Sequence, residues 1–195
     1  MKKAFGLLLL AAAMTLAFTT AVETVKVDTT KSTVAWKAYK VTGEHSGTVN
    51  IKNGELMMEG GALVGGSFEM DMGTILVTDL KGKMKERLEG HLNSPDFFSV
   101  EEFPSASFKI TKVAPRGTPG DYKVVGDLTI KGITKEVKFN TSVKEEEGAM
   151  VATAAIQVDR SDFNVRYGSG SFFENLGDKT IYDEFDLTVT LVSAN

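Results

Sequence analysis

Apolar and polar residues alternate one by one over much of this chain, and this pattern predicts β-strands. Successive side chains of a strand point to opposite faces, so the alternation gives one apolar face and one face towards water. Parallel strands covered on both faces would show continuous apolar runs, so antiparallel pairing is favoured. The alternating segments are 34–39, 64–72, 122–131, 137–139 and 185–192.

Clusters of turn-forming residues separate these segments. Asn53-Gly54 is the strongest hairpin signal, because both residues tolerate a positive φ. Further turns are expected at Gly60-Gly61, at 118–120, at Lys131-Gly132 and at 145–148. About eight strands with short connections predict an all-β domain, either a closed up-and-down antiparallel barrel or a sandwich.

Two segments interrupt the strands. From about Asp79 to Asn93 the apolar residues lie four positions apart among charged residues, which predicts an amphipathic helix. Asp79 is the expected N-cap, and Asn93 followed by Pro95 is expected to end the helix. A second irregular segment spans 161–180. The apolar residues of the predicted helix are Met84, Leu88 and Leu92.

The first 21 residues have the pattern of a secretory signal peptide. Lys2 and Lys3 precede an apolar run at 5–17 that is short for a bilayer span, and small residues stand before Val22. A retained N-terminal anchor is the alternative. Cleavage leaves one domain, 22–195, in the periplasm or outside the cell. The sequence has no cysteine, so disulfides and a lipid-modified cysteine are excluded.

The charge balance excludes one class of partner and disfavours another. Removing residues 1–21 takes away two lysines and no acids, which leaves 20 basic and 26 acidic residues. Phosphate neutralisation needs clustered Lys and Arg, so nucleic-acid binding is not expected. The same balance is poorly suited to an anionic membrane surface, and stable membrane insertion is not expected.

Residues suited to catalysis are scarce. His45 and His91 are the only histidines, and neither belongs to a zinc motif. They could bind a metal together with a distant carboxylate, or they could be polar residues at a barrel rim and on a helix flank. Arg160 could hold an anionic head group, or it could pair locally with Asp159 and Asp162. We therefore predict no catalytic residue and no metal site.

A series of motifs occurs in a fixed order along the chain: Trp36, 44–49, 66–72, 91–98, 103–108, 126–134, 159–165 and 181–185. In these motifs the chain resembles the YceI-like family of periplasmic polyisoprenoid-binding proteins. The resemblance implies a lipocalin-like barrel of about eight strands with one helix packed beside it. It also implies that the barrel binds a long isoprenoid chain, such as the tail of a quinone or of a polyprenyl phosphate, with no other cofactor. Members of this family can pair, so a homodimer is a candidate assembly.

Our first hypothesis is a soluble, exported isoprenoid-binding protein for transport, storage or sensing. Burying each methylene contributes about 0.8 kcal/mol, so a carrier must enclose most of the tail. The residues expected to line the barrel are Phe68, Met70, Met72, Phe108, Leu128 and Ile130. Those expected to close one side or end are Trp36, Leu88, Leu92, Phe97 and Phe98. Those expected to form a lip are Phe163, Phe172 and Phe173. The head-group candidates are His45, His91 and Arg160.

Two other classes of function stay open at this point. The barrel could be filled by its own side chains and serve as an interaction module, which would require a large exposed apolar patch. The protein could also be a small-molecule enzyme that uses His45 or His91 with a nearby carboxylate. The inside of the barrel discriminates among these hypotheses, because only a ligand carrier needs an apolar hollow there.

Overall fold

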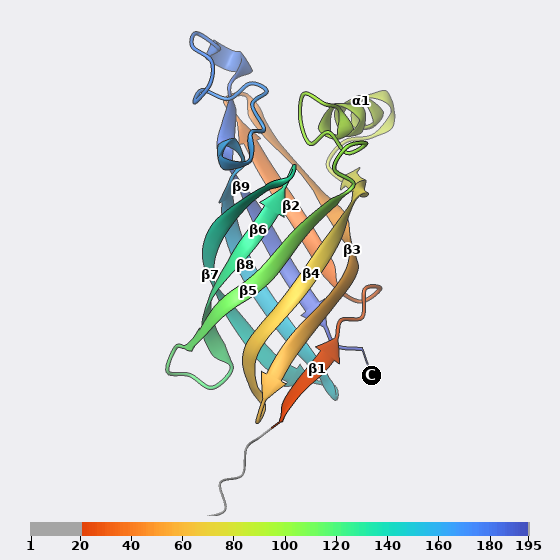
Figure 1. Ribbon diagram of the computed structural model, residues 1–195. Coiled ribbons are helices and arrows are strands. Elements are labelled where there is room, and N and C mark those ends of the chain that lie inside the picture. Colours follow the sequence, from red (N-terminus) through yellow and green to blue (C-terminus); the bar gives the residue numbers. More distant parts are fainter. Residues whose placement is uncertain (1–20, 195) are drawn as a thin grey trace, which may run out of the picture.

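A computed structural model describes residues 21–194 of this protein, and within them nine antiparallel strands form one sheet. The strand order is β1-β3-β2-β9-β8-β7-β6-β5-β4, and an additional β3–β4 pairing closes the sheet. Strands β2 to β9 therefore form an eight-stranded barrel, with β1 paired to residues 55–59 of β3 beside it (Figure 1). The strands are β1 Val22–Lys26, β2 Thr33–Lys40, β3 Gly43–Glu59, β4 Ala62–Val77, β5 Ser105–Pro115, β6 Asp121–Ile130, β7 Ile133–Glu146, β8 Ala149–Asp159 and β9 Ile181–Val192.

The predicted closed antiparallel barrel with one helix beside it is confirmed. The predicted signal peptide falls almost entirely on residues 1–20, which lie outside the described residues, and stays a prediction. Among residues 21–194, no helix combines the length and the apolar character that a membrane crossing requires.

The two ends of the barrel differ in how the strands are connected (Figure 1). At one end, which we call the closed end, short connections join β3 to β4, β5 to β6 and β7 to β8. At the other end, which we call the mouth, helix α1 (Gly82–Asn93) lies between β4 and β5, and residues 160–180 lie between β8 and β9. That second insertion contains the 3-10 helices Arg160–Phe163 and Gly177–Lys179.

Helix α1 begins later than the sequence predicts, because Asp79 does not cap it. The Asp79 carboxylate accepts a hydrogen bond from the Ser46 N–H at 3.0 Å and lies 2.8 Å from Nδ1 of His45, both on β3. Lys81 occupies the N-cap position without a side-chain hydrogen bond. Glu89 then docks the helix on β4 by accepting from the Val77 N–H. Met84 is 68% exposed, so the apolar stripe that packs on the barrel is shorter than expected.

Irregular register between β3 and β4 corrects two further predictions. Asn53-Gly54 is not a turn: both residues lie inside β3, and Gly54 is suited to this place because the Phe68 ring packs over it. A register shift between Met57 and Met58 reverses the alternation at the start of β4. Leu63 therefore faces the interior, and Val64, which was predicted to do so, is exposed.

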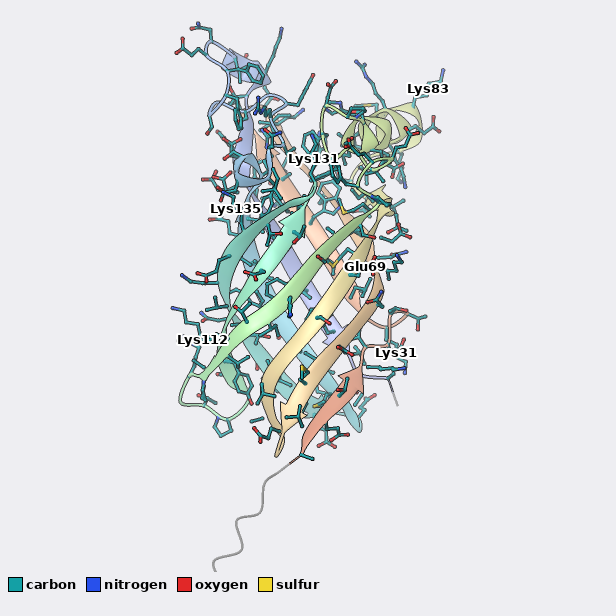
Figure 2. All side chains as sticks on the ribbon, viewed as in Figure 1. Lys31, Glu69, Lys83, Lys112, Lys131 and Lys135 are labelled. Atoms are coloured by element: carbon teal, nitrogen blue, oxygen red, sulfur yellow. The ribbon has the colours of Figure 1, made fainter. Side chains whose placement is uncertain are left out.

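Charged side chains cover the outer surface of the barrel wall, with Glu69 near its middle (Figure 2). The Glu69 carboxylate accepts hydrogen bonds from Ser105 Oγ on β5 and from Lys52 Nζ and Asn53 Nδ2 on β3. These bonds lower the pKa of Glu69 to about 2, and the bond from Ser105 has the largest effect. Glu69 thus links three neighbouring strands from the outside.

Candidate functional site

An apolar cavity of about 120 Å³ lies inside the barrel next to the mouth, and we call it the upper cavity. An engineered cavity of about 150 Å³ with similar walls binds benzene, so the upper cavity is slightly smaller than such a site. Among the described residues that line it, Arg160 alone is charged. The other lining residues are Val34, Trp36, Ala38, Val49, Met70, Met72, Ile75, Leu92, Phe97, Phe98, Ala106, Leu128, Ile130, Ile181, Tyr182, Phe185 and Leu187.

A second apolar cavity, the lower cavity, has a volume of about 100 Å³ and extends towards the closed end. Four residues line both cavities, so the two are adjoining parts of one hollow: Val34, Met70, Leu128 and Leu187. The residues that line the lower cavity alone are Ile51, Leu56, Leu63, Phe68, Phe108, Ile110, Val124, Val137, Phe139, Thr141, Ala152, Thr153, Ala154, Ile156, Val189 and Leu191.

The closed end is sealed by a tightly packed apolar cluster. Leu63, Val124 and Leu56 are buried in it, together with Tyr122. The Tyr122 hydroxyl accepts a hydrogen bond from the Leu63 N–H at 3.2 Å and so links β6 to β4 across this end. The hollow therefore extends from a sealed floor towards the mouth.

Trp36 forms part of the upper cavity wall and is held there by its backbone surroundings. Its Nε1 donates to the Thr48 carbonyl at 3.3 Å. The ring packs against Gly47, where an added Cβ would lie 2.5 Å from Trp36 Cζ2. Since Trp36 is the only tryptophan of the chain, its fluorescence reports on this cavity.

Arg160 is 3% exposed and fastens the irregular segment 160–180 to the barrel. Its guanidinium donates to the carbonyls of Val165, Ile181 and Tyr182 at 2.8–3.1 Å. Nη2 also lies 3.2 Å from Oδ1 of Asp183, although this oxygen has no well-aligned hydrogen bond among the described residues. Burial lowers the pKa of Arg160 from its ordinary value, whereas the charges of Asp183 and Asp159 raise it.

The sequence predicted Arg160 either as a head-group ligand or as the partner of Asp159 and Asp162 in a local turn. Its main contacts are the carbonyls of Val165, Ile181 and Tyr182 and the carboxylate of Asp183 rather than Asp159 and Asp162, and its role as a head-group ligand stays a prediction. Asp159 instead accepts from the Ser161 N–H and caps the first 3-10 helix. Arg160 still lines the upper cavity, but most of its N–H groups are engaged.

Asp183 also binds the glycine- and serine-rich segment 168–171. Its Oδ2 accepts from Ser169 Oγ at 2.9 Å and from Ser171 Oγ at 2.7 Å. Ser169 is fully buried. The insertion 160–180 is therefore held by Asp183 near its middle and by Arg160 at its start.

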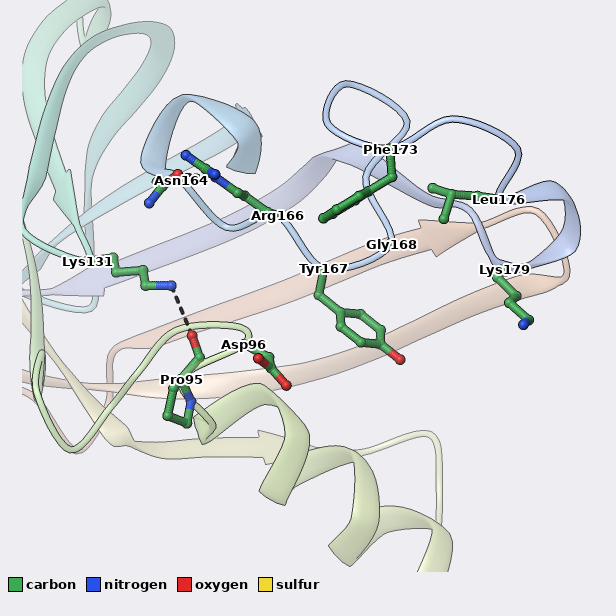
Figure 3. Close-up of a pocket in the computed structure, with 10 residues that line it drawn as sticks. All are labelled: Pro95, Asp96, Lys131, Asn164, Arg166, Tyr167, Gly168, Phe173, Leu176 and Lys179. Carbon is green, nitrogen blue, oxygen red and sulfur yellow. Dashed lines mark hydrogen bonds between the residues drawn. The ribbon is translucent and has the colours of Figure 1, made fainter.

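A wider cleft of about 630 Å³ lies at the mouth, outside the apolar hollow (Figure 3). Three cations and one carboxylate line it: Lys131, Arg166 and Lys179, with Asp96. Lys131 Nζ donates to the carbonyl of Pro95, which lines this cleft, and to the carbonyl of Phe97, which lines the upper cavity. The remaining lining residues are Pro95, Asn164, Tyr167, Gly168, Phe173 and Leu176.

An aromatic layer separates the cleft from the upper cavity. The His91 ring makes edge contacts with Phe97 and Tyr167, at centroid distances of 5.5 and 4.3 Å. Phe97 also packs against Phe98 and lies under the Arg160 guanidinium. Phe97 and Phe98 thus lie at the mouth end of the hollow. His91 Nε2 is buried and has no hydrogen-bond partner among the described residues.

The structure brings most of the predicted lining residues together around the two cavities. Leu88 is half-buried and packs against the apolar cluster that contains Leu92 and Phe97, but it does not line the upper cavity. The predicted residues that line the upper cavity are Trp36, Met70, Met72, Leu92, Phe97, Phe98, Leu128 and Ile130. Those that line the lower cavity are Phe68, Met70, Phe108 and Leu128.

Of the three residues predicted to form a lip, Phe172 and Phe173 lie at the surface and Phe163 does not. Phe163 is 1% exposed and packs in the core below the mouth, because the 3-10 helix turns its side chain inwards. Phe173 lines the mouth cleft. Phe172 is 39% exposed and lies under the Arg166 guanidinium, outside both cavities.

Neither histidine lines the cavities or the cleft. His45 pairs with Asp79 at the β3–β4 end, and His91 lies in the aromatic layer. Within residues 21–194, no group of three or more His, Cys, Asp or Glu side chains is arranged to hold a metal. This geometry counts against an enzyme built on either histidine.

Several cavity residues were missed as site residues, although the alternation pattern had marked their strands. Val34, Ala38, Phe185 and Leu187 lie on the expected inward faces of β2 and β9. Alternation indicates which face of a strand is inside, but it does not show where the interior is empty. That depends on the side chains that meet from opposite walls.

Comparisons with known proteins agree with this geometry. The family model described as a YceI-like domain matches residues 25–193. A UPF0312 protein of Photorhabdus laumondii is 34% identical over 124 residues, which cover 60% of this chain and 58% of that protein. A UPF0312 protein of Staphylococcus aureus is 34% identical over 101 residues, which cover 48% of this chain and 55% of that protein. The chain thus matches less than two thirds of the length of these relatives.

Two solved structures show the same fold. BcnA of Burkholderia cenocepacia superposes with a TM-score of 0.67 at 23% identity, covering 86% of this chain and 99% of that chain. A polyisoprenoid binding domain of Saccharophagus degradans, implicated in plant cell wall breakdown, superposes with a TM-score of 0.63 at 10% identity, covering 89% and 98%.

Proposed function

Because the chain belongs to the family of YceI-like domains, we propose that it is an exported carrier that binds a long isoprenoid lipid inside its barrel. The observation that carries this proposal is the apolar hollow formed by the two adjoining cavities. A structural neighbour that is a polyisoprenoid binding domain supports the same ligand class. Transport, storage and sensing all require this binding step.

The apolar walls match the chemistry of an isoprenoid tail. Each buried methylene contributes about 0.8 kcal/mol, and the branched methyl groups of isoprene units suit the irregular spaces between Met, Leu and Phe side chains. The hollow as it stands accommodates only a part of a long tail. Binding therefore requires movement at its narrow middle, where Met70 is the flexible residue.

The polar head would lie at the mouth, since the hollow offers little to bind it. Lys131, Arg166 and Lys179 outnumber the single carboxylate of the mouth cleft, Asp96. These cations favour a phosphate head, and their N–H groups also suit the carbonyls of a quinone. Comparing an isoprenoid phosphate with the matching alcohol and quinone distinguishes these heads.

The other classes of function are less well supported. A barrel filled by its own side chains, as an interaction module would have, does not agree with the apolar hollow. A homodimer is compatible with the carrier function, and sedimentation of the purified protein tests it.

Titration with farnesol, followed by Trp36 fluorescence, tests the proposal. We expect saturable quenching or a blue shift, because Trp36 lines the upper cavity. Ala38→Leu fills that cavity and should abolish the response. Ala155→Leu makes the same change on an exposed residue of β8 and should retain it. The absence of both a fluorescence response and an isoprenoid in extracts of the natively purified protein would overturn the proposal.

A further inference from the structure

Three glycines lie inside strands that line the lower cavity, at positions where a glycine weakens a strand. They are Gly54 on β3, Gly66 on β4 and Gly126 on β6. Their φ angles are not positive, so backbone conformation does not require glycine there. Their neighbours explain them instead.

Each of these glycines has a phenyl ring close to its Cα. A Cβ at Gly126 would lie 2.3 Å from Phe108 Cζ, and one at Gly54 would lie 2.8 Å from Phe68 Cδ1. At Gly66 it would lie 2.7 Å from the Glu55 carbonyl and 3.3 Å from Phe68 Cζ. The rings therefore occupy space that a side chain would otherwise take, and lie close against the barrel wall.

The two rings belong to a continuous aromatic surface. Phe68 and Phe108 are stacked at a centroid distance of 6.4 Å with planes 13° apart, and Phe108 lies 5.4 Å from Phe139. All three line the lower cavity, and we call them the phenyl wall. On β8 the lining residues include Ala152 and Ala154, whose small side chains leave the space that the cavity occupies.

From this arrangement we infer that the lower cavity is the subsite for the tail terminus, and that the phenyl wall limits how many isoprene units the barrel accepts. The inference rests on the proposed function and goes beyond it by naming the residues that set the tail length. The cavity lies farthest from the mouth and next to the sealed closed end, so a tail entering from the mouth ends there. Its volume of about 100 Å³ suits a single branched end group.

Binding of an isoprenoid alcohol series tests this inference, with Trp36 fluorescence as the readout. The series is geraniol, farnesol, geranylgeraniol and solanesol. For the wild type we expect affinity to rise with tail length and then to reach a plateau once the hollow is full. Phe108→Ala extends the hollow, so the plateau should move to a longer alcohol, with a gain of about tenfold for the first alcohol beyond the wild-type plateau.

The opposite change fills the same subsite. Ala154→Leu should move the plateau to a shorter alcohol, because the added side chain takes the place of the end group. Control variants truncate or enlarge a side chain outside the hollow: Met84→Ala on the exposed face of α1 and Ala155→Leu on the outer face of β8. Both should keep the wild-type plateau. Phe108→Leu serves as the milder variant if Phe108→Ala does not fold.

The outcomes separate this inference from the proposed function. An unchanged plateau in both Phe108→Ala and Ala154→Leu, with a wild type that binds the alcohols, overturns the inference alone. Failure of the wild type to bind any alcohol overturns the proposed function, and the inference falls with it. Opposite shifts in the two variants support it, because a general loss of packing would weaken all alcohols in the same direction.

Discussion

The closed end and the mouth of this barrel are built from the same strands but are stabilised by different interactions. At the closed end, short connections bring apolar side chains into one packed cluster, and the buried Tyr122 hydroxyl accepts from the Leu63 N–H. At the mouth, a helix and a long segment are held by a buried arginine, serine hydroxyls and carboxylates. Figure 1 shows both insertions at that end.

The difference indicates where the molecule can open. A packed apolar cluster loses contacts with any movement, so the closed end is expected to be rigid. The insertions of the mouth are fastened at a few polar points, and the segments between these points can move without disturbing the barrel. Ligand entry is therefore expected at the mouth, next to Trp36 and Phe98.

Replacing Arg160 should have the largest effect and would test the polar fastening directly. Arg160→Met leaves Asp183 buried without its cation and three carbonyls without their donor. We expect a loss of about 3–5 kcal/mol in the free energy of unfolding, measured with urea. Hydrogen exchange should rise in 161–180 before it rises at the closed end.

Arg166→Met is the control for that variant, because Arg166 lies on the same segment but is exposed. Its free energy of unfolding should stay within about 0.5 kcal/mol of wild type. Equal stability of the two variants would show that Arg160 does not fasten the mouth.

An intermediate effect is expected at the closed end. Tyr122→Phe removes the acceptor of the buried Leu63 N–H and should cost about 1–3 kcal/mol in urea unfolding. Isoprenoid binding, followed by Trp36 fluorescence, should be unchanged. Tyr182→Phe at the mouth alters an exposed tyrosine and should leave stability unchanged. A large loss of binding in Tyr122→Phe would mean that the two ends are not independent.

The smallest effect concerns Glu69, on the outer wall between the two ends. Its pKa is lowered from 4.5 to about 2, first by the hydrogen bond from Ser105. A carboxylate with a lowered folded-state pKa stabilises the fold above its unfolded pKa, and this contribution is lost as the pH falls towards 2. Glu69→Gln should therefore unfold at slightly lower urea than wild type at pH 7, and the difference should shrink between pH 4.5 and 2. A difference that is independent of pH would argue against this role.

Much of the fold could be predicted because its signals are local. Period-two alternation predicted the strands, and glycine pairs such as Gly60-Gly61 predicted the turns of the closed end. The errors arose where a distant residue decides the outcome. Asn53-Gly54 lies inside a strand because Phe68 packs over Gly54, and Asp79 does not cap α1 because His45 and Ser46 bind it.

The candidate site divides in the same way. The inward faces that carry Met70 and Leu128 follow from alternation within single strands. The role of Arg160 could not be predicted, since its partners at 181–183 are brought near only when β8 and β9 pair. Nor could the sequence show that Phe163 is buried and Phe172 exposed. Phe163 is buried because it ends a short 3-10 helix that turns its side chain into the core, and Phe172 lies outside that helix.

By itself, the sequence determined the antiparallel strands, their inward faces and the family motifs, because each depends on residues close together in the chain. Only the tertiary structure decided that the interior is hollow, that the hollow has two adjoining parts, and which end is sealed. The physical reason is that empty space is a property of side chains from opposite walls. Their separation is fixed by barrel closure and by the glycines on which the phenyl rings lie.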